Sequence, residues 1–303
     1  MTNQDLFDAI HRNDLRSLTS ALAGSAKVDG RDGSNRTPLY RVAEEGPEQA
    51  AEMAQQLLDA GARIDLKPTA KAWSALHHAA YHGDRALAAV LLEAGAQAGD
   101  QENGDRWAPL HLAINGEVVT LLLAAGADPE ATDRAGSTPL LAAVVQQANV
   151  RASEDVRSRV QALLEAGCRL EVRDRDDNTP LLRAVKLPVP EALDLLIAAG
   201  ADVQAGDFFS GSALHAAAAG DHAWAIRALA GGGAAIDSQE IENRLTPLAL
   251  AAVLGRVRAV RALLAHGADP TIPDQQGKTA MDHARSDEIR GLLEAAPEPA
   301  EEP

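Results

Sequence analysis

The chain has 303 residues, but it contains only one cysteine, Cys168, and only eight aromatic residues. A single cysteine excludes an intrachain disulfide, and Cys168 stands where other parts of the chain have alanine, which predicts a buried thiol rather than a nucleophile. Aromatic residues make up 3% and apolar residues 46%, so the core must consist mainly of alanine, leucine and valine. Such a core favours closely stacked helices over a β-sandwich, because sandwiches favour aromatic and β-branched residues.

Long apolar runs are also missing. No stretch of 18 apolar residues occurs, so the sequence predicts no transmembrane helix and no membrane partner. The N-terminal stretch MTNQDLFDAIHRND is polar and acidic, and it lacks the apolar region of a secretory signal. We therefore expect a cytoplasmic location.

Basic residues are scarce relative to acidic ones. The chain has 28 Lys and Arg against 44 Asp and Glu, which gives a formal net charge of −16. Nucleic-acid binding needs clustered Lys and Arg opposite the phosphates, so this balance argues against a nucleic-acid partner. It favours a protein partner with a basic surface and fast electrostatic association.

Motifs that carry catalysis or hold cofactors are absent from the sequence. It has no glycine-rich phosphate loop ending in Lys-Ser or Lys-Thr, no serine nucleophile elbow and no CxxC pair. The acidic pairs Glu44–Glu45 and Asp176–Asp177 could serve acid–base chemistry, but such pairs on an acidic surface are usually just solvated. We therefore expect no enzymatic activity and no cofactor.

What the sequence does contain is an internal repeat. Stretches such as RTPLYRVAEEG (36–46), WSALHHAAYHG (73–83) and LTPLALAAVLG (245–255) align, and a second motif such as LLAAGADP follows most of them. A period of this length predicts a solenoid, in which each unit buries its apolar face against its neighbours. The signature leucine or its equivalent recurs every 30 to 41 residues, at Leu39, Leu76, Leu110, Leu140, Leu181, Leu214, Leu248 and Met281.

The pattern resembles the ankyrin repeat, whose period and Thr-Pro-Leu-His signature it follows over nearly the whole chain. The resemblance implies an all-α ankyrin-repeat solenoid, a curved array of helix-loop-helix units joined by β-turn or hairpin fingers. We expect one domain over residues 1–296 and a disordered acidic tail over 297–303. The units are placed approximately at 1–31, 32–66, 67–101, 102–132, 133–173, 174–206, 207–240, 241–273 and 274–296.

Residues at the ends of the expected helices support this interpretation. A threonine followed by proline stands at several helix starts, where it suits the N-cap and first helical positions, at Thr37, Thr138, Thr179 and Thr246. Turns that hold Gly136 or Gly277 in two units hold Ala72, Arg106 or Arg244 in others. We expect those turns to be reshaped, because non-glycine residues resist positive φ. An insertion near 146–158 predicts a longer first helix or a protruding loop.

The stretch SALHHAAYHGD (74–84) holds three of the nine histidines. His78 and His82 have the i,i+4 spacing of a zinc-binding helix, but Ala79 stands where that motif needs a glutamate. His77, like His111 and His215, is at the signature position, where the resemblance implies hydrogen bonding between neighbouring units. Metal binding by His78 and His82 therefore stays a minor alternative.

In the ankyrin family, partners contact the turn tips and the ends of the first helices. Aromatic residues, which are favoured interface anchors, gather at these positions in this chain. The predicted partner-binding residues are Trp73, Tyr81, His82, Trp107, Asp105, Phe208, Phe209, Glu44, Glu45, Asp176 and Asp177. For the aromatic residues the alternative is packing on an adjacent tip, and for the acidic residues it is simple solvation.

The sequence therefore predicts a monomeric, non-enzymatic protein–protein interaction module that binds a protein with a basic surface. One version is an inhibitor or immunity protein for a toxin or enzyme encoded beside it, since the Ala- and Arg-rich composition suggests a bacterial chain. The competing class is a secreted effector that engages host proteins. Genomic neighbourhood would separate these two classes.

Overall fold

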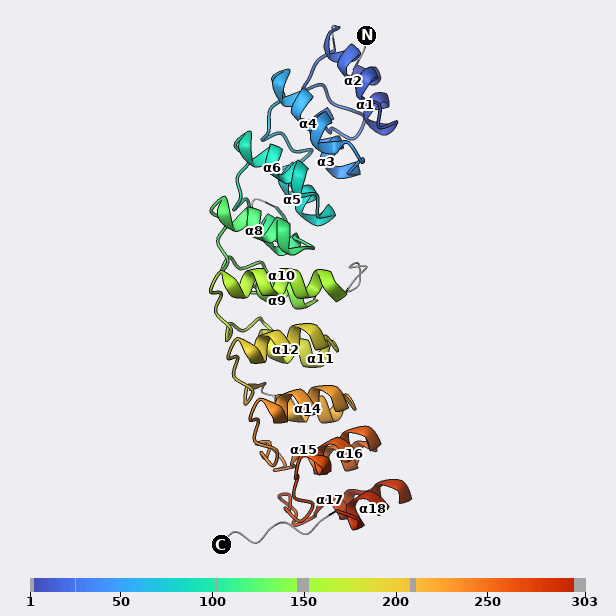
Figure 1. Ribbon diagram of the computed structural model, residues 1–303, viewed down its shortest axis with the longest axis vertical. Coiled ribbons are helices and arrows are strands. Elements are labelled where there is room, and N and C mark those ends of the chain that lie inside the picture. The colour runs from blue at the N-terminus through green and yellow to red at the C-terminus, as the bar shows by residue number, and fades with distance from the viewer. Residues whose placement is uncertain (1–2, 25, 102, 146–152, 208–210, 297–303) are drawn as a thin grey trace. The chain divides into compact units, whose positions relative to one another are not determined.

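The structure, a computed structural model, describes residues 3–24, 26–101, 103–145, 153–207 and 211–296. The chain divides into two compact units, Met1–Cys168 and Arg169–Pro303. Within each unit, the repeats follow one another as pairs of short helices joined by loops (Figure 1). Phe208, Phe209, the acidic tail over 297–303 and most of the predicted insertion lie outside the described residues.

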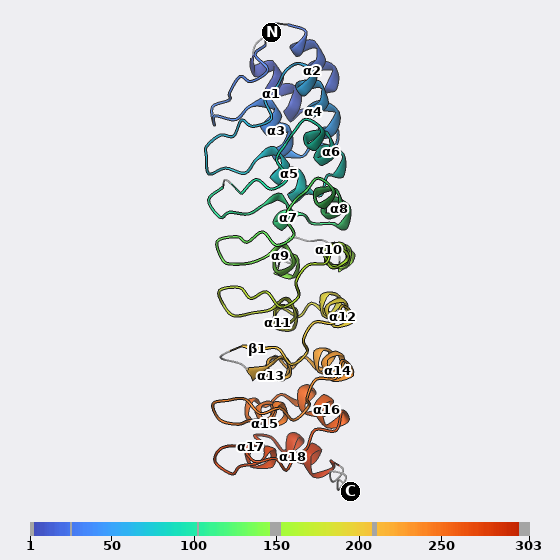
Figure 2. The ribbon, with the colours of Figure 1, turned by 90° about the vertical axis from the view of Figure 1, so that its left-hand side faces the viewer.

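In the first unit, each repeat contributes a first helix and a second helix. Successive first helices pack on one another and successive second helices do the same, which gives two rows with the loop tips on one side (Figure 2). The first helices are α1 (Asn3–His11), α3 (Pro38–Glu45), α5 (Ala75–His82), α7 (Pro109–Leu112) and α9 (Pro139–Val145). The second helices are α2 (Leu15–Leu22), α4 (Ala50–Asp59), α6 (Arg85–Glu93), α8 (Gly116–Ala124) and α10 (Ser153–Glu165).

The second unit repeats this arrangement. Its first helices are α11 (Pro180–Lys186), α13 (Ala213–Ala219), α15 (Pro247–Leu254) and α17 (Ala280–His283). Its second helices are α12 (Pro190–Ala198), α14 (Ala223–Gly231), α16 (Val257–Ala265) and α18 (Asp287–Glu294). One finger forms a short antiparallel ladder of β1 (Gly206–Asp207) and β2 (Gly211–Ser212), in which Gly206 pairs with Ser212 and Asp207 with Gly211.

The core of both units consists of leucine and alanine, as the composition predicts. The signature leucines are almost completely buried, and alanines fill the neighbouring positions on the same helices. Small alanine side chains let the helices approach closely, while each leucine removes a large apolar surface from water. Within the described ranges, no helix has both the length and the apolar character needed to cross a membrane.

The threonine caps are confirmed. The hydroxyls of Thr37, Thr179 and Thr246 accept hydrogen bonds from backbone N–H groups three residues later, at 3.1 to 3.3 Å. Each cap satisfies one of the N–H groups that have no partner inside the helix. From α4 to α16, each second helix is followed two residues after its end by a glycine with positive φ, at Gly61, Gly95, Gly126, Gly167, Gly200, Gly233 and Gly267.

The expectation of reshaped turns is wrong for two of the three non-glycine positions. Arg106 and Arg244 adopt left-handed conformations, with φ of 58° and 55°, near the 77° and 76° of Gly136 and Gly277. A glutamine side chain holds each turn, because Gln101 donates to the carbonyl of Arg106 at 2.7 Å and to that of Thr132 at 3.1 Å. Gln239 does the same for Arg244 and Pro273, at 2.8 and 3.0 Å. These bonds offset the cost of positive φ.

Candidate protein-binding surface

Three aromatic residues of the predicted binding set lie together in the first unit. Trp73 precedes α5, Tyr81 is in the last turn of α5, and Trp107 precedes α7. The ring centroid of Trp73 is 6.0 Å from that of Trp107 and 5.5 Å from that of Tyr81, with the rings tilted by 52° and 53°. These are the separations and tilts at which aromatic pairs attract each other.

Two further rings join these three: Tyr40, which sequence reasoning missed, and His78, which it considered only as a metal ligand. The His78 ring lies 5.2 Å from Trp73 and 5.2 Å from Tyr40, and the Tyr40 hydroxyl hydrogen-bonds His78 Nε2 at 3.0 Å. Tyr40 occupies the signature position that histidine holds in other units. This replacement was the feature of the sequence that could have pointed to Tyr40. We call Tyr40, Trp73, His78, Tyr81 and Trp107 the aromatic cluster.

A shortened helix places part of this cluster at the surface. The first helices α3 and α5 span eight residues each, but α7 spans four and ends at Leu112. The last turn of α5 therefore meets a connecting segment in place of a helix: Ile114 donates to the carbonyl of Ala80 at 3.4 Å, and Asn115 to that of Gly83 at 2.9 Å. About three residues are missing between Ala113 and Val118 relative to the other repeats, and the structure takes up this deletion in the first helix itself.

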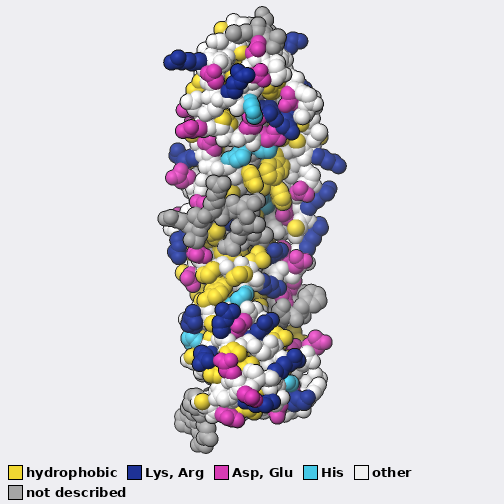
Figure 3. Space-filling model, turned by 90° about the vertical axis from the view of Figure 1, so that its right-hand side faces the viewer, with side chains coloured by type: hydrophobic (Ala, Val, Ile, Leu, Met, Phe, Trp, Pro, Cys, Tyr) yellow, Lys and Arg dark blue, Asp and Glu magenta, His cyan; other side chains and the backbone are white. Residues whose placement is uncertain are grey.

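The cluster is partly buried and partly exposed. Tyr40 is buried, while Trp73, His78, Tyr81 and Trp107 are half-buried. The packing on adjacent tips that the sequence left open as an alternative is thus present, yet the rings keep exposed area. On one face of the first unit, hydrophobic side chains gather beside histidines (Figure 3).

Trp107 is anchored by the tip of the next repeat. Its indole Nε1 donates to a carboxylate oxygen of Asp133 at 3.0 Å. Within the tip that carries Trp107, the side-chain oxygen of Asn103 accepts a hydrogen bond from the backbone N–H of Trp107 at 3.0 Å. The predicted contact Asp105 is exposed on the same tip. The Trp107 ring is therefore held in one orientation on a tip that also carries the exposed side chain of Asp105.

The acidic pair at the end of α3 is engaged in ion pairs. Glu44 lies 2.8 Å from Arg36, and Glu45 pairs with Arg41. The Nε2 atom of His82 is hydrogen-bonded to the backbone carbonyl of Glu44 at 2.9 Å. The structure brings Glu44, Glu45 and His82 next to the cluster, but the two carboxylates are largely neutralised. Asp176 and Asp177 are in the second unit, where Asp177 pairs with Arg173 at 3.0 Å and Asp176 is exposed.

The signature histidines link neighbouring repeats, as the resemblance implies. His77 Nδ1 accepts the backbone N–H of Ser74 at 3.1 Å, so Nε2 carries the proton and donates to the carbonyl of Trp107 at 2.7 Å. His111 and His215 make the same pair of bonds in their own repeats. Burial lowers the pKa of each of these three imidazoles below its ordinary value.

The ring nitrogens of His78 and His82 bond protein oxygens on α3, as described above. In the part of the chain that the structure describes, no group of three or more histidine, cysteine, aspartate or glutamate side chains is placed to hold a metal ion. Cys168 is buried, and burial raises the pKa of its thiol to about 11. At neutral pH this thiol is protonated and a poor nucleophile.

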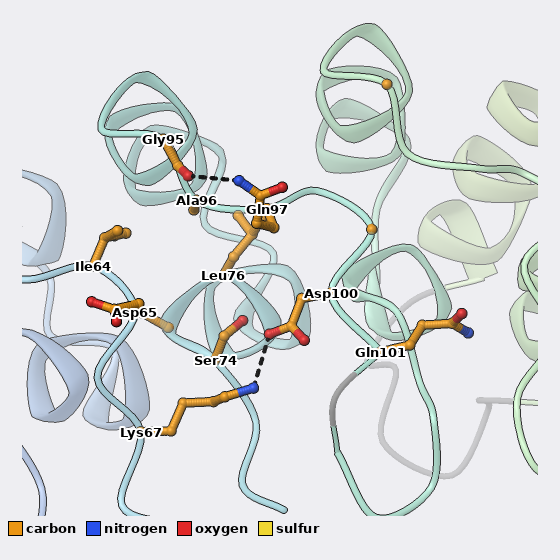
Figure 4. Close-up of a pocket in the computed structure, with 13 residues that line it drawn as sticks. Ile64, Asp65, Lys67, Ser74, Leu76, Gly95, Ala96, Gln97, Asp100 and Gln101 are labelled. Carbon is orange, nitrogen blue, oxygen red and sulfur yellow. Dashed lines mark hydrogen bonds and ion pairs between the residues drawn. The ribbon is translucent and has the colours of Figure 1, made fainter. Parts of the chain in front are cut away.

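A hollow of about 650 Å³ lies between loops of the first unit, and its lining includes none of the five residues of the cluster (Figure 4). Lys67 and Asp100 line it and form an ion pair at 3.2 Å, with side chains about 15% exposed. Asp65, also on its wall, pairs with Arg63 at 2.6 Å. Because these charges are paired within the protein, the hollow does not favour a charged cofactor.

Comparison with known proteins decides the family. The family described as ankyrin repeats (3 copies) matches residues 6–102, 48–133, 76–157, 110–207 and 214–298, which together span most of the chain. The chain belongs to the ankyrin repeat family. Its all-α solenoid fold is that of the family, and ankyrin repeats are protein–protein interaction modules that are generally non-catalytic.

Solved ankyrin repeat structures resemble this chain. The ankyrin repeat domain of Bcl-3, described as a unique member of the IkappaB protein family, is 28% identical with a TM-score of 0.62, covering 72% of this chain and 97% of that one. The human ASB11 ankyrin repeat domain is 25% identical with a TM-score of 0.60, covering 75% and 99%. The mouse 2-5A-dependent ribonuclease is 40% identical over 76 residues, which are 24% of this chain and 10% of that protein.

Proposed function

We propose that this ankyrin repeat chain is a non-enzymatic module that binds one protein partner through the aromatic cluster and the loop tips beside it. The observation that carries the proposal is the cluster itself. Four of the eight aromatic residues of the chain meet in the first unit, and three of them, Trp73, Tyr81 and Trp107, keep exposed area. Tyrosine and tryptophan are enriched among the residues that dominate binding energy.

The partner is proposed to carry a basic surface. The net charge of −16 creates a negative field around the chain, which attracts a positively charged protein and speeds its encounter. Asp105 is an exposed carboxylate on the Trp107 tip, where a basic residue of the partner can reach it. Charge then sets the rate of association, while the rings supply most of the affinity.

An inhibitor or immunity role is the specific form that we propose. An acidic binder suits the neutralisation of a basic toxin or enzyme, because such a role needs fast capture. A gene for a basic toxin or enzyme next to that of this chain would support the role. Its absence from every related genome would contradict it without affecting the proposal of protein binding.

Affinity purification from cell extract tests the proposal. The whole chain is immobilised, washed at low salt and eluted with urea, and the eluate is identified by mass spectrometry. We expect one basic protein that is retained by the native chain and by Trp224→Ala, but lost with Trp73→Ala/Trp107→Ala. Trp224 is a matched control, because it is a half-buried tryptophan in the second unit. Equal retention by both variants would contradict the proposed surface.

A further inference from the structure

We propose that the exposed side of the aromatic cluster receives an uncharged aliphatic side chain of the partner, of the size of leucine, and not a lysine or arginine. This inference rests on the proposed function, and it names the chemistry of the contact. The basic residues of the partner then lie beside the cluster, at carboxylates such as Asp105. Aromatic rings can also attract cations through their faces, so the two kinds of occupant must be distinguished by the surroundings of the rings.

Three carboxylates close to the rings are already engaged, whereas Asp105 projects from the tip as an exposed side chain. Glu44 pairs with Arg36 at 2.8 Å, and Glu45 pairs with Arg41. Asp133 accepts the indole N–H of Trp107 at 3.0 Å. A cation placed on the rings would have to compete with these partners, because stable cation binding at a partly desolvated site requires an opposite charge.

The charged and titratable groups around His78 also disfavour a cation. On its own helix, α5, the neighbours are His77 and His82, and from the side of α3 come Tyr40, Glu44 and Arg36. Burial, reinforced by His82, His77 and Arg36, lowers the pKa of His78 to about 4. The same surroundings that keep this imidazole neutral at pH 7 would destabilise an ammonium or guanidinium group beside it.

The closeness of the rings favours an aliphatic group. The short α7 ends at Leu112, so the last turn of α5 with Tyr81 extends beyond it in the row of first helices. The Trp73 ring lies 5.5 Å from Tyr81 and 6.0 Å from Trp107, so an apolar group placed on the exposed side of Trp73 is within reach of three half-buried rings. Branched aliphatic side chains gain dispersion energy from several ring faces at once and lose little entropy on binding.

The indole N–H signals of the three tryptophans in a two-dimensional nitrogen–proton NMR spectrum provide the test. The whole chain is titrated with N-acetyl-leucine amide and, in a second series, with N-acetyl-arginine amide. We expect the leucine compound to shift the Trp73 and Trp107 signals saturably, with a dissociation constant on the order of a few mM, as its small size allows. Trp224 should not move, and Trp73→Ala should abolish the shift of Trp107.

Two outcomes would overturn the inference. If the arginine compound shifts the Trp73 and Trp107 signals more strongly than the leucine compound, the occupant is a cation, and the proposed function stands. If neither compound shifts them, the cluster has no pocket for an isolated side chain. Failure of the proposed function is distinguished separately, because in that case Trp73→Ala would leave the affinity for the purified partner unchanged.

Discussion

His77, His111 and His215 each hold a helix start with one ring nitrogen and the next repeat with the other. This double role requires the neutral ring, because Nδ1 accepts a hydrogen bond from a backbone N–H and would itself be protonated in the charged form. His78 has a different task, because it joins α5 to α3 through the Tyr40 hydroxyl. At the scale of residues, the hydrogen bonds between repeats therefore depend on neutral histidines, so the stability of the array depends on pH.

Stability should fall on acidification, and His78 should account for part of the loss. Its pKa is about 4 in the folded chain against 6.5 ordinarily, so the unfolded state binds the proton more tightly. The stability contributed by neutral His78 is fully present above pH 6.5 and is lost as the pH falls toward 4. Urea unfolding of the native chain and of His78→Gln at pH 7 and pH 4.5 measures this contribution. We expect the native chain to lose about 2 kcal/mol more than the variant, and equal losses would contradict the assignment.

Arg106 should be replaceable by glycine with a gain in stability. Its φ of 58° is costly for a residue with a Cβ, and Gly136 holds the corresponding turn of the next repeat. Allowing for the greater entropy of glycine in the unfolded chain, Arg106→Gly should raise the free energy of unfolding by about 0.5 to 1 kcal/mol. Arg106→Ala is the matched control, because it removes the same side chain and keeps the strain. A gain in both variants would show that the arginine side chain is the cause.

Structural features formed by residues close together in the sequence could be predicted from it. Contacts between residues far apart in the sequence could not. The caps at Thr37 and Thr246 are visible because cap and partner are three residues apart. The contact of Tyr40 with His78 joins residues 38 apart, and nothing in either motif indicates it. Arg106 was misjudged for the same reason, since the bond from Gln101 to the carbonyl of Thr132 spans 31 residues.

At the scale of helices, α8 and α10 pack closely enough to require a glycine. The N–H of Gly116 donates to the Ser158 hydroxyl at 3.0 Å, and a Cβ on Gly116 would lie 2.6 Å from the backbone oxygen of Ser158. On α10, Arg159 has a fully buried side chain, and burial lowers its pKa to about 10. The sequence predicts an insertion before this helix, but it gives no sign of a buried arginine.

Gly116→Ala should destabilise the chain by about 1 to 3 kcal/mol, because the added methyl forces α8 and α10 apart. Gly291→Ala is the matched control, since Gly291 lies within α18 and a Cβ there would meet nothing within 4 Å. That control should stabilise the chain by about 0.5 to 1 kcal/mol through helix propensity. Thermal unfolding of both variants checks the pair. A Gly116→Ala variant as stable as the native chain would contradict the close packing of α8 on α10.

At the scale of the whole molecule, the net charge and the aromatic cluster have different roles in binding. The charge of −16 acts at long range and is screened by salt, whereas the aromatic cluster acts only on contact. The association rate of the partner should therefore fall roughly tenfold between about 20 mM and about 500 mM NaCl, with little change in the dissociation rate. Surface plasmon resonance separates the two rates. A dissociation rate that rises in parallel would indicate that ion pairs, and not the rings, hold the complex.

The affinity of the purified partner for Trp73→Ala tests the central claim most directly. Trp73 contacts Tyr81 and Trp107 within the cluster, so its removal opens the surface that the partner is proposed to cover. We predict a dissociation constant about 30-fold weaker for Trp73→Ala, and one within about twofold of the native value for Trp224→Ala, with both variants folded by circular dichroism. An affinity unchanged in folded Trp73→Ala would show that the partner binds elsewhere.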